Sequence, residues 1–145
     1  MIKSSLSLVL CLGVATAALA HSGVENPAVM ARMDAMSRIG AEVTVIGLMA
    51  RGETLFDAEE ARAAAAAIAE QAALVPELFA TPEDDPKSEA RKAIWEDYDR
   101  FIEMNGAMET VAIALSESIT TQEDAMMALR TLGQTCRTCH EAFRE

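Results

Sequence analysis

Apolar residues of this chain recur at steps of three and four positions, which is the spacing of one face of an α-helix. A β-sheet domain needs many turn residues, yet the 145 residues include only 7 Gly and 4 Pro. With 51% apolar residues, the chain is also too apolar to be disordered. Length and pattern together predict one all-α domain. The clearest apolar run comprises Met36, Ile39, Val43, Ile46 and Ala50.

The first twenty residues have the three parts of a secretory signal peptide. Lys3 is positively charged, residues 6–14 are apolar, and residues 18–20 form a small-x-small cleavage site. The apolar stretch is shorter than the roughly 20 residues that span a membrane. We therefore expect residues 1–20 to be removed, residues 21–145 to form the mature domain, and the protein to reach the periplasm without a membrane anchor.

Capping residues indicate where the first two helices begin. Asn26-Pro27 combines an N-cap with a proline at the first helical position, so a helix is expected from there to Gly52. Asp57 with Glu60 three residues later resembles a capping box and opens a second helix. That helix contains a run of alanines at residues 63–67 and is expected to stop at Pro76.

The second half of the mature chain is expected to contain a crossover loop and two more helices. Residues 81–86 hold two prolines and three acids, which predicts the loop. A third helix is expected from about Ser88 to Leu115, with a weak point at Asn105-Gly106. Four helices with short connections predict an antiparallel four-helix bundle. Thr121 with Asp124 opens the last helix, whose expected buried face comprises Met126, Leu129, Gly133, Cys136, His140 and Phe143.

The last helix carries the motif Cys136-Arg137-Thr138-Cys139-His140, which is CxxCH, the attachment signature of a c-type haem. Two thiols at this spacing can each form a thioether to one vinyl group of the haem. The adjacent imidazole is a nitrogen ligand suited to iron. Gly133, one turn earlier, is expected to leave room for a flat macrocycle. The sequence therefore predicts one covalently bound haem c, held by Cys136, Cys139 and His140.

Three other interpretations of the motif agree less well with the rest of the chain. A thioredoxin-like CxxC begins a helix in a βαβ unit, but no strand pattern precedes this motif. A structural zinc site needs four ligands, and no second CxxC or HxxxH is present. A disulfide between Cys136 and Cys139 would leave His140 without a partner. Export favours haem, because c-type haem is attached outside the cytoplasm.

An acidic four-helix domain with CxxCH close to its C-terminus resembles the cytochrome c′ family and its low-spin, six-coordinate relatives. The resemblance implies that His140 is the proximal iron ligand and that Met36 lies over the distal haem face. It also implies that Arg32, one turn earlier, lies near the haem propionates. The matching segments are residues 32–36, Gly52-Glu53, residues 76–79, Ile94-Trp95 and residues 141–144.

Met36 has two interpretations, a core methionine or a thioether ligand of the iron. Met30 and Met33 do not share the apolar face with Ile39 and are weaker candidates. Ligation by His140 and Met36 predicts a periplasmic, non-enzymatic carrier of single electrons. Without the Met36 bond, the alternative is a five-coordinate cytochrome c′ that binds nitric oxide or another diatomic gas. A peroxidase would need a further acid–base residue, and no distal histidine is available.

The charge of the chain limits its partners. Twelve basic and 23 acidic side chains give a net charge of −11, and removal of Lys3 with the signal peptide makes the mature domain one unit more negative. Nucleic acid is therefore excluded as a partner, and redox partner proteins with a basic docking patch are expected, with association that weakens as salt rises. The resemblance also implies that a homodimer through the first two helices is possible.

Overall fold

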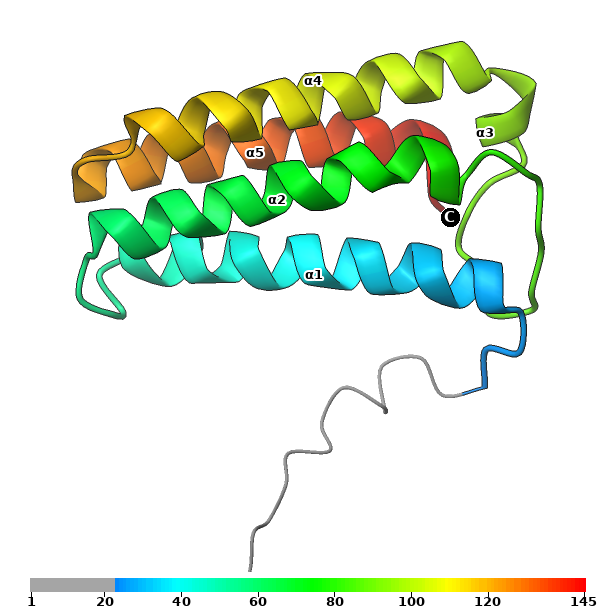
Figure 1. Cartoon of the computed structure of the whole chain (residues 1–145), viewed down its shortest axis with the longest axis horizontal. Helices are drawn as coiled ribbons and strands as arrows, with labels where there is room; N and C mark the ends of the chain where they lie inside the picture. The colour runs from blue at the N-terminus through cyan, green and yellow to red at the C-terminus, as the bar shows by residue number, and fades with distance from the viewer. Residues whose placement is uncertain (1–22) are drawn as a thin grey trace, which may run out of the picture.

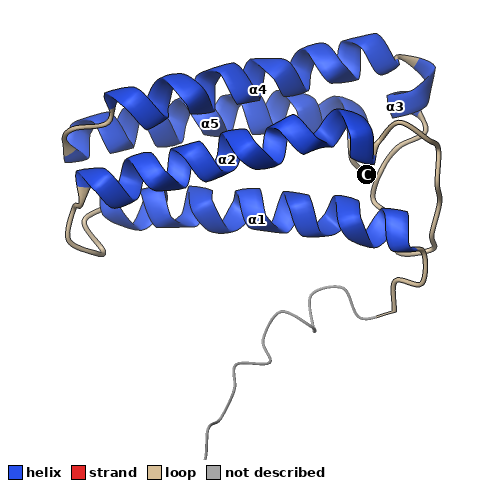
Figure 2. Ribbon diagram, in the orientation of Figure 1, coloured by secondary structure: helices blue, strands red, loops and turns tan. Residues whose placement is uncertain are grey.

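The computed structural model describes residues 23–145, and this part of the chain contains four long helices and one short helix (Figures 1 and 2). The predicted signal peptide lies outside the described residues. Within them, none of the helices combines the length and apolarity that a membrane span requires. The helices are α1 (Pro27–Ala50), α2 (Ala58–Leu78), α3 (Ala93–Glu96), α4 (Tyr98–Ser118) and α5 (Gln122–Phe143).

The four long helices form a square bundle. Helix α1 packs against α2 and α5, and α4 packs against the same two helices. Figure 1 shows that consecutive long helices run in opposite directions, joined at the ends of the bundle. The predicted antiparallel four-helix bundle is therefore confirmed.

Three of the four predicted helix starts are confirmed by their hydrogen bonds. The Asn26 side chain accepts from the backbone N–H groups of Ala28 and Val29, and Pro27 is the first residue of α1. Asp57 Oδ1 caps α2 in the same way. Thr121 and Asp124 form a reciprocal capping box at the start of α5. In each case a side-chain oxygen satisfies N–H groups that have no partner within the helix.

The prediction that the second helix stops at Pro76 is wrong, because α2 continues through this proline to Leu78. Proline has no N–H, so the carbonyl oxygen of Ala72, four residues earlier, loses its normal partner. In the structure Asn105 Nδ2 of α4 donates to Ala72 O at 3.0 Å, and Tyr98 Oη donates to Pro76 O at 2.6 Å. The Asn105 side chain thus supplies the hydrogen-bond donor that Ala72 O lacks because residue 76 is a proline, and Tyr98 supplies one to Pro76 O.

The same contact explains why α4 has no break at Asn105-Gly106. Asn105 is only 4% exposed and faces α2, so its amide stabilises the bundle here and α4 runs unbroken from Tyr98 to Ser118. The sequence alone showed a poor helix former followed by glycine. The burial of the amide against α2 outweighs that local preference.

The third helix does not begin at Ser88, as predicted. Residues 79–92 form a crossover segment, followed by the short α3, and α4 begins only at Tyr98. Backbone groups of the segment pair with the end of α5 instead: Ala90 and Arg144 form an isolated antiparallel bridge, and Arg91 N donates to Phe143 O at 2.9 Å. In the same bridge Glu145 N donates to Glu89 O at 2.9 Å, and a helix starting at Ser88 would need that carbonyl for the N–H group of Ala93.

Asp85 ties the crossover segment to the start of α1. Its carboxylate accepts from the backbone N–H groups of Glu25, Asn26 and Lys87 at 2.8 to 3.0 Å. These hydrogen bonds favour the ionised form and lower the pKa of Asp85. The segment predicted as a plain loop is therefore held at a defined place on the bundle.

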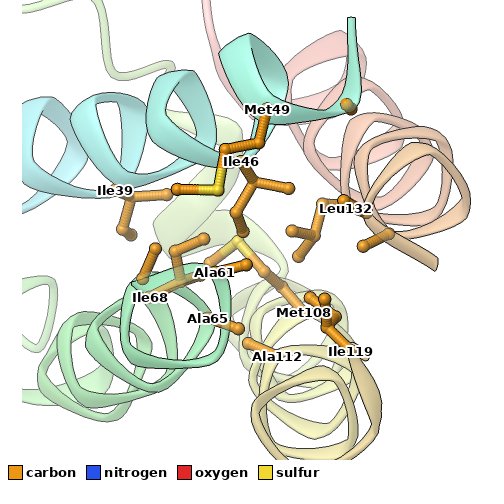
Figure 3. Close-up of a cluster of buried hydrophobic side chains, with 14 of the residues drawn as sticks. Ile39, Ile46, Met49, Ala61, Ala65, Ile68, Met108, Ala112, Ile119 and Leu132 are labelled. Atoms are coloured by element: carbon orange, nitrogen blue, oxygen red, sulfur yellow. The ribbon is translucent and has the colours of Figure 1, made fainter. Parts of the chain in front are cut away.

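Buried side chains form two clusters along the bundle. The first cluster fills the end opposite the crossover segment and is built on small residues of α2, such as Ala61 and Ala65, against isoleucines of α1 (Figure 3). The second cluster lies at the crossover end and is largely aromatic. It consists of Val75, Phe79, Ile94, Phe101 and Phe143.

The apolar face predicted for α1 is confirmed, since Ile39, Ile46 and Ala50 are buried. His140, near the end of the face predicted for α5, is exposed and not buried, and the predicted face is also wrong in the first half of the helix, where Met126 and Gly133 are exposed. Ala125, Ala128 and Leu132 are buried there instead, one residue before each expected position. Methyl side chains on this face let α5 approach its neighbours closely, which the larger Met126 would prevent.

Replacing Asn105 by alanine should lower the free energy of unfolding by about 1–3 kcal/mol, because Ala72 O would be buried without a donor. Denaturant titration followed by circular dichroism measures this loss. In a Pro76→Ala background residue 76 regains an N–H for Ala72 O, so the same change should cost less. Equal costs in both backgrounds would contradict the compensation. Thr110→Ala, on the exposed face of α4, is the control and should stay within about 0.5 kcal/mol.

Candidate functional site

A cavity of about 520 Å³ lies inside the bundle at the crossover end. All four long helices and the crossover segment contribute to its walls. This volume lies within the range of about 300–1,000 Å³ that is typical of cofactor and small-molecule sites. Most of its lining is apolar, with Val29 and Met36 from α1, Val75 and Phe79 near the end of α2, and Phe101 from α4.

The CxxCH motif lies on the wall that α5 contributes. Cys136, Cys139 and His140 all line the cavity, because residues three and four positions apart share one face of a helix. Both cysteines are half-buried free thiols. Cys136 packs against the first cluster and Cys139 against the second, so the motif spans the junction of the two. The structure thus brings all three predicted attachment residues to one cavity.

Burial determines the titration of these three side chains. It raises the pKa of the Cys136 and Cys139 thiols, because an apolar setting disfavours the thiolate. It also lowers the pKa of His140, with a smaller contribution from the positive charge of Arg144 and opposition from Glu89. The neutral imidazole favoured in this way is the form that binds a metal.

The structure offers no ligand set for the zinc interpretation. Among residues 23–145, no three His, Cys, Asp or Glu side chains are placed so that they could together hold a metal ion.

Met36 lines the cavity from α1 and is partly buried. It packs against both clusters, so it lies on α1 at the same junction that Cys136 and Cys139 occupy on α5. Met33 also lines the cavity, whereas Met30 does not. The structure therefore places the predicted distal residue on the same cavity as His140.

Arg32 is buried on α1, one turn before Met36, and also lines the cavity. Its guanidinium donates three hydrogen bonds to backbone carbonyl oxygens, those of Leu78, Thr81 and Glu83. Burial lowers its pKa, and the nearby Glu83 carboxylate opposes this shift. Three of the five N–H donors of Arg32 are thus used by the backbone.

Several cavity residues were not predicted. Met104 and Met108 of α4 line the cavity, and their spacing of four residues is a signal that could have been noticed. Asn105, between them, is the buried amide described above. Ser88, Glu89 and Ala90 come from the crossover segment, which no local sequence pattern connects with α5.

Gly40 rather than Gly133 provides open space at the cavity. Gly133 does not line the cavity, whereas Gly40 does, one turn after Met36. A Cβ atom built on either glycine would meet no other heavy atom within 4 Å, so the position of Gly40 on the cavity is what distinguishes the two. The α1 backbone is therefore open to a flat group at this point. Two thiols and an imidazole on one wall, a glycine on the opposite helix and apolar surroundings fit a covalently bound haem.

A four-helix bundle with CxxCH on the wall of an apolar cavity in its last helix defines a c-type cytochrome. Comparison with known proteins agrees: the family model for cytochrome c′ matches residues 27–144. The chain belongs to the cytochrome c′ family, and its cofactor is covalently attached haem c.

Individual relatives support the assignment over most of their length. The chain is 35% identical over 115 residues to a cytochrome c-556 of Agrobacterium tumefaciens, covering 79% of this chain and 91% of that protein. It is 35% identical over 121 residues to a cytochrome c′ of Cereibacter sphaeroides, covering 80% and 81%. Among solved structures, a cytochrome c′ from Rhodobacter superimposes with a TM-score of 0.73 at 30% identity, covering 81% of this chain and 94% of that one.

The double variant Cys136→Ser with Cys139→Ser, exported without covalent haem, should lose its cooperative thermal transition or be degraded. Even cavities of side-chain size cost several kcal/mol, and a domain has only about 5–15 kcal/mol of stability. Far-UV circular dichroism of the purified protein, together with its periplasmic yield, measures the effect. His140→Ala, which keeps both thiols, is the control and should retain most of its helix content. A haem-free double variant that melts as cooperatively as the holoprotein would contradict this expectation.

Proposed function

We propose that this cytochrome is a periplasmic carrier of single electrons in which His140 and Met36 would both bind the haem iron. The observation that carries the proposal is the position of Met36, whose side chain lines the cavity from α1 while His140 lines it from α5. Bound haem c supplies one-electron chemistry between its ferric and ferrous states. No enzymatic step is part of the proposal.

The roles of the side chains follow from their chemistry. Cys136 and Cys139 would each hold the cofactor by one thioether, and His140 would bind the iron on the same side. A thioether ligand such as Met36 favours the ferrous state and raises the reduction potential. The apolar walls formed by Val29, Val75 and their neighbours exclude water, which further disfavours the more highly charged ferric form.

Arg32 has a proposed role at the edge of the cofactor. Two of its five N–H donors are not used by the three backbone carbonyls, and the side chain lines the cavity. A haem propionate beside it would receive a charge-assisted hydrogen bond.

A second candidate function is the reversible binding of a diatomic gas, nitric oxide above all, at a five-coordinate iron. The observation that favours it is the open space beside Gly40 on the same helix as Met36. In this case Met36 would be a lid over the sixth position and not a ligand.

Periplasmic location is supported by the sequence of residues 1–20 and by the attachment of c-type haem outside the cytoplasm. A homodimer through α1 and α2 would use the outer face of α2, where Ala63 and Ala73 are exposed. Both points stay predictions.

Replacing Met36 by leucine separates the two candidate functions. If Met36 binds the iron, the ferric protein should be low-spin with the weak thioether charge-transfer band, and Met36→Leu should become high-spin and bind carbon monoxide readily. Absorption spectra of both oxidation states measure this. Met33→Leu changes another methionine of the same wall and should leave the spectrum unchanged. A wild-type protein that is already high-spin and binds carbon monoxide would refute ligation by Met36 and support gas binding.

The acidic surface should steer the choice of redox partner. A net charge of −11 for the whole chain favours a partner with a basic docking patch. The second-order rate of electron transfer from such a donor should fall as ionic strength rises, because salt screens exposed charges over about 10 Å at 0.1 M. Stopped-flow measurements over a salt series test this. A rate that does not change with salt would show that long-range attraction has no part in the encounter.

A further inference from the structure

Arg32 is a buried, charged side chain that makes three hydrogen bonds to the backbone. It is 3% exposed, and its Nε, Nη1 and Nη2 atoms donate to Leu78 O, Glu83 O and Thr81 O at 2.8, 2.8 and 2.6 Å. All three acceptors lie at the end of α2 or in the turn that follows it. A planar guanidinium can reach three carbonyls at once, which the single ammonium of lysine cannot.

Two aromatic rings add to this arrangement. The Arg32 guanidinium carbon lies 4.9 Å from the centre of the Phe79 ring and 5.1 Å from that of Trp95. Trp95 is itself held in place, because its Nε1 donates to Phe79 O at 2.9 Å. Cation–π contacts of this kind are strongest where water is excluded, as it is here. Arg32 therefore joins α1 to the end of α2 and to α3 at one point.

The crossover segment, residues 79–92, also contacts the start of α1 and the end of α5 on the other side of the cavity. Asp85 binds it to the backbone at the start of α1, through Glu25 and Asn26. Further along, Ala90 pairs with Arg144 at the end of α5, and Glu89 forms an ion pair with the same arginine. One segment thus links α1, which carries Met36, to α5, which carries His140, and forms part of the cavity wall between them.

We infer that Arg32 is a positioning residue for Met36: by holding α1 on the crossover segment, it sets the separation between Met36 and His140 that simultaneous binding to one iron requires. The inference rests on the proposed His140 and Met36 ligation. Ligand sets must be held to within about 0.5 Å of their working geometry. Met36 is one turn from Arg32, so a shift of α1 at the arginine moves the sulfur directly. Loss of the three hydrogen bonds would leave partly buried carbonyls without these donors and favour such a shift.

The test compares three variants of the holoprotein with covalent haem. Arg32→Gln removes the guanidinium, and Arg32→Lys keeps the charge but cannot reach three carbonyls. Arg62→Gln is the matched control, because Arg62 also donates to a backbone carbonyl, Ile119 O at 2.9 Å, but does so remote from the cavity. The readouts are the ferric spin state, the thioether charge-transfer band and the rate of carbon monoxide binding, alongside helix content by circular dichroism.

If Arg32 positions Met36, both Arg32 variants should lose part of the thioether band, gain high-spin ferric haem and bind carbon monoxide about tenfold faster, which corresponds to about 1.4 kcal/mol. Arg62→Gln should keep the wild-type spectrum. Should Arg32→Gln prove too unstable to purify, Asp85→Asn weakens the same attachment and should shift the spectrum in the same direction. Low-spin spectra in Arg32→Gln and Arg32→Lys, or in Asp85→Asn when it stands in for them, overturn the inference.

Two further outcomes separate this inference from other causes. A wild-type protein that is high-spin overturns the proposed ligation together with this inference, whereas low-spin wild-type and low-spin Arg32→Gln overturn the inference alone. If Arg32→Lys restores the wild-type spectrum while Arg32→Gln does not, the positive charge near a propionate is responsible and the positioning role is refuted.

Discussion

The carbonyl oxygens at the C-terminal end of α2 need donors that the helix cannot supply. Pro76 deprives Ala72 O of its partner, and the last turn of any helix has unpaired carbonyls. Four side chains from three other helices provide the hydrogen bonds. Asn105 donates to Ala72 O, Tyr98 to Pro76 O, Arg32 to Leu78 O and Trp95 to Phe79 O. Because α1, α3 and α4 converge on these atoms, the geometry of the cavity depends on them.

The cavity is possible because the core is divided into two unlike parts. At the end shown in Figure 3, small residues of α2 such as Ala65 let the helices approach closely. Isoleucine and methionine side chains fill the interior there. At the crossover end the core is largely aromatic, and Phe101 packs edge-on against Phe143 with ring centres 5.4 Å apart. The cofactor cavity lies at the junction of these two parts, because residues of both clusters line it. Met36, which contacts both clusters, is at that boundary.

The crossover segment gives the bundle a property that helix packing alone does not. Most of the length of α1 and α5 is held by direct packing, but at the cavity the two helices are connected through residues 79–92. Such an arrangement keeps an apolar volume available for a large flat group while limiting how far its walls can move. For the proposed one-electron transfer, walls of this kind would keep the accompanying reorganisation small.

The sequence by itself determined the helical class, the starts of α1, α2 and α5, and the attachment motif, because each depends on residues within a few positions of one another. Asn26 with Pro27, Thr121 with Asp124, and the CxxCH motif all act over one turn of helix. The family resemblance correctly led to the cytochrome c′ family. Only the tertiary structure decided that α2 passes through Pro76, that α4 continues through Asn105, and that Gly40 lines the cavity in place of Gly133. These features depend on contacts between residues some thirty or more positions apart, such as Asn105 with Ala72 and Arg32 with Leu78, and no local pattern contains that information.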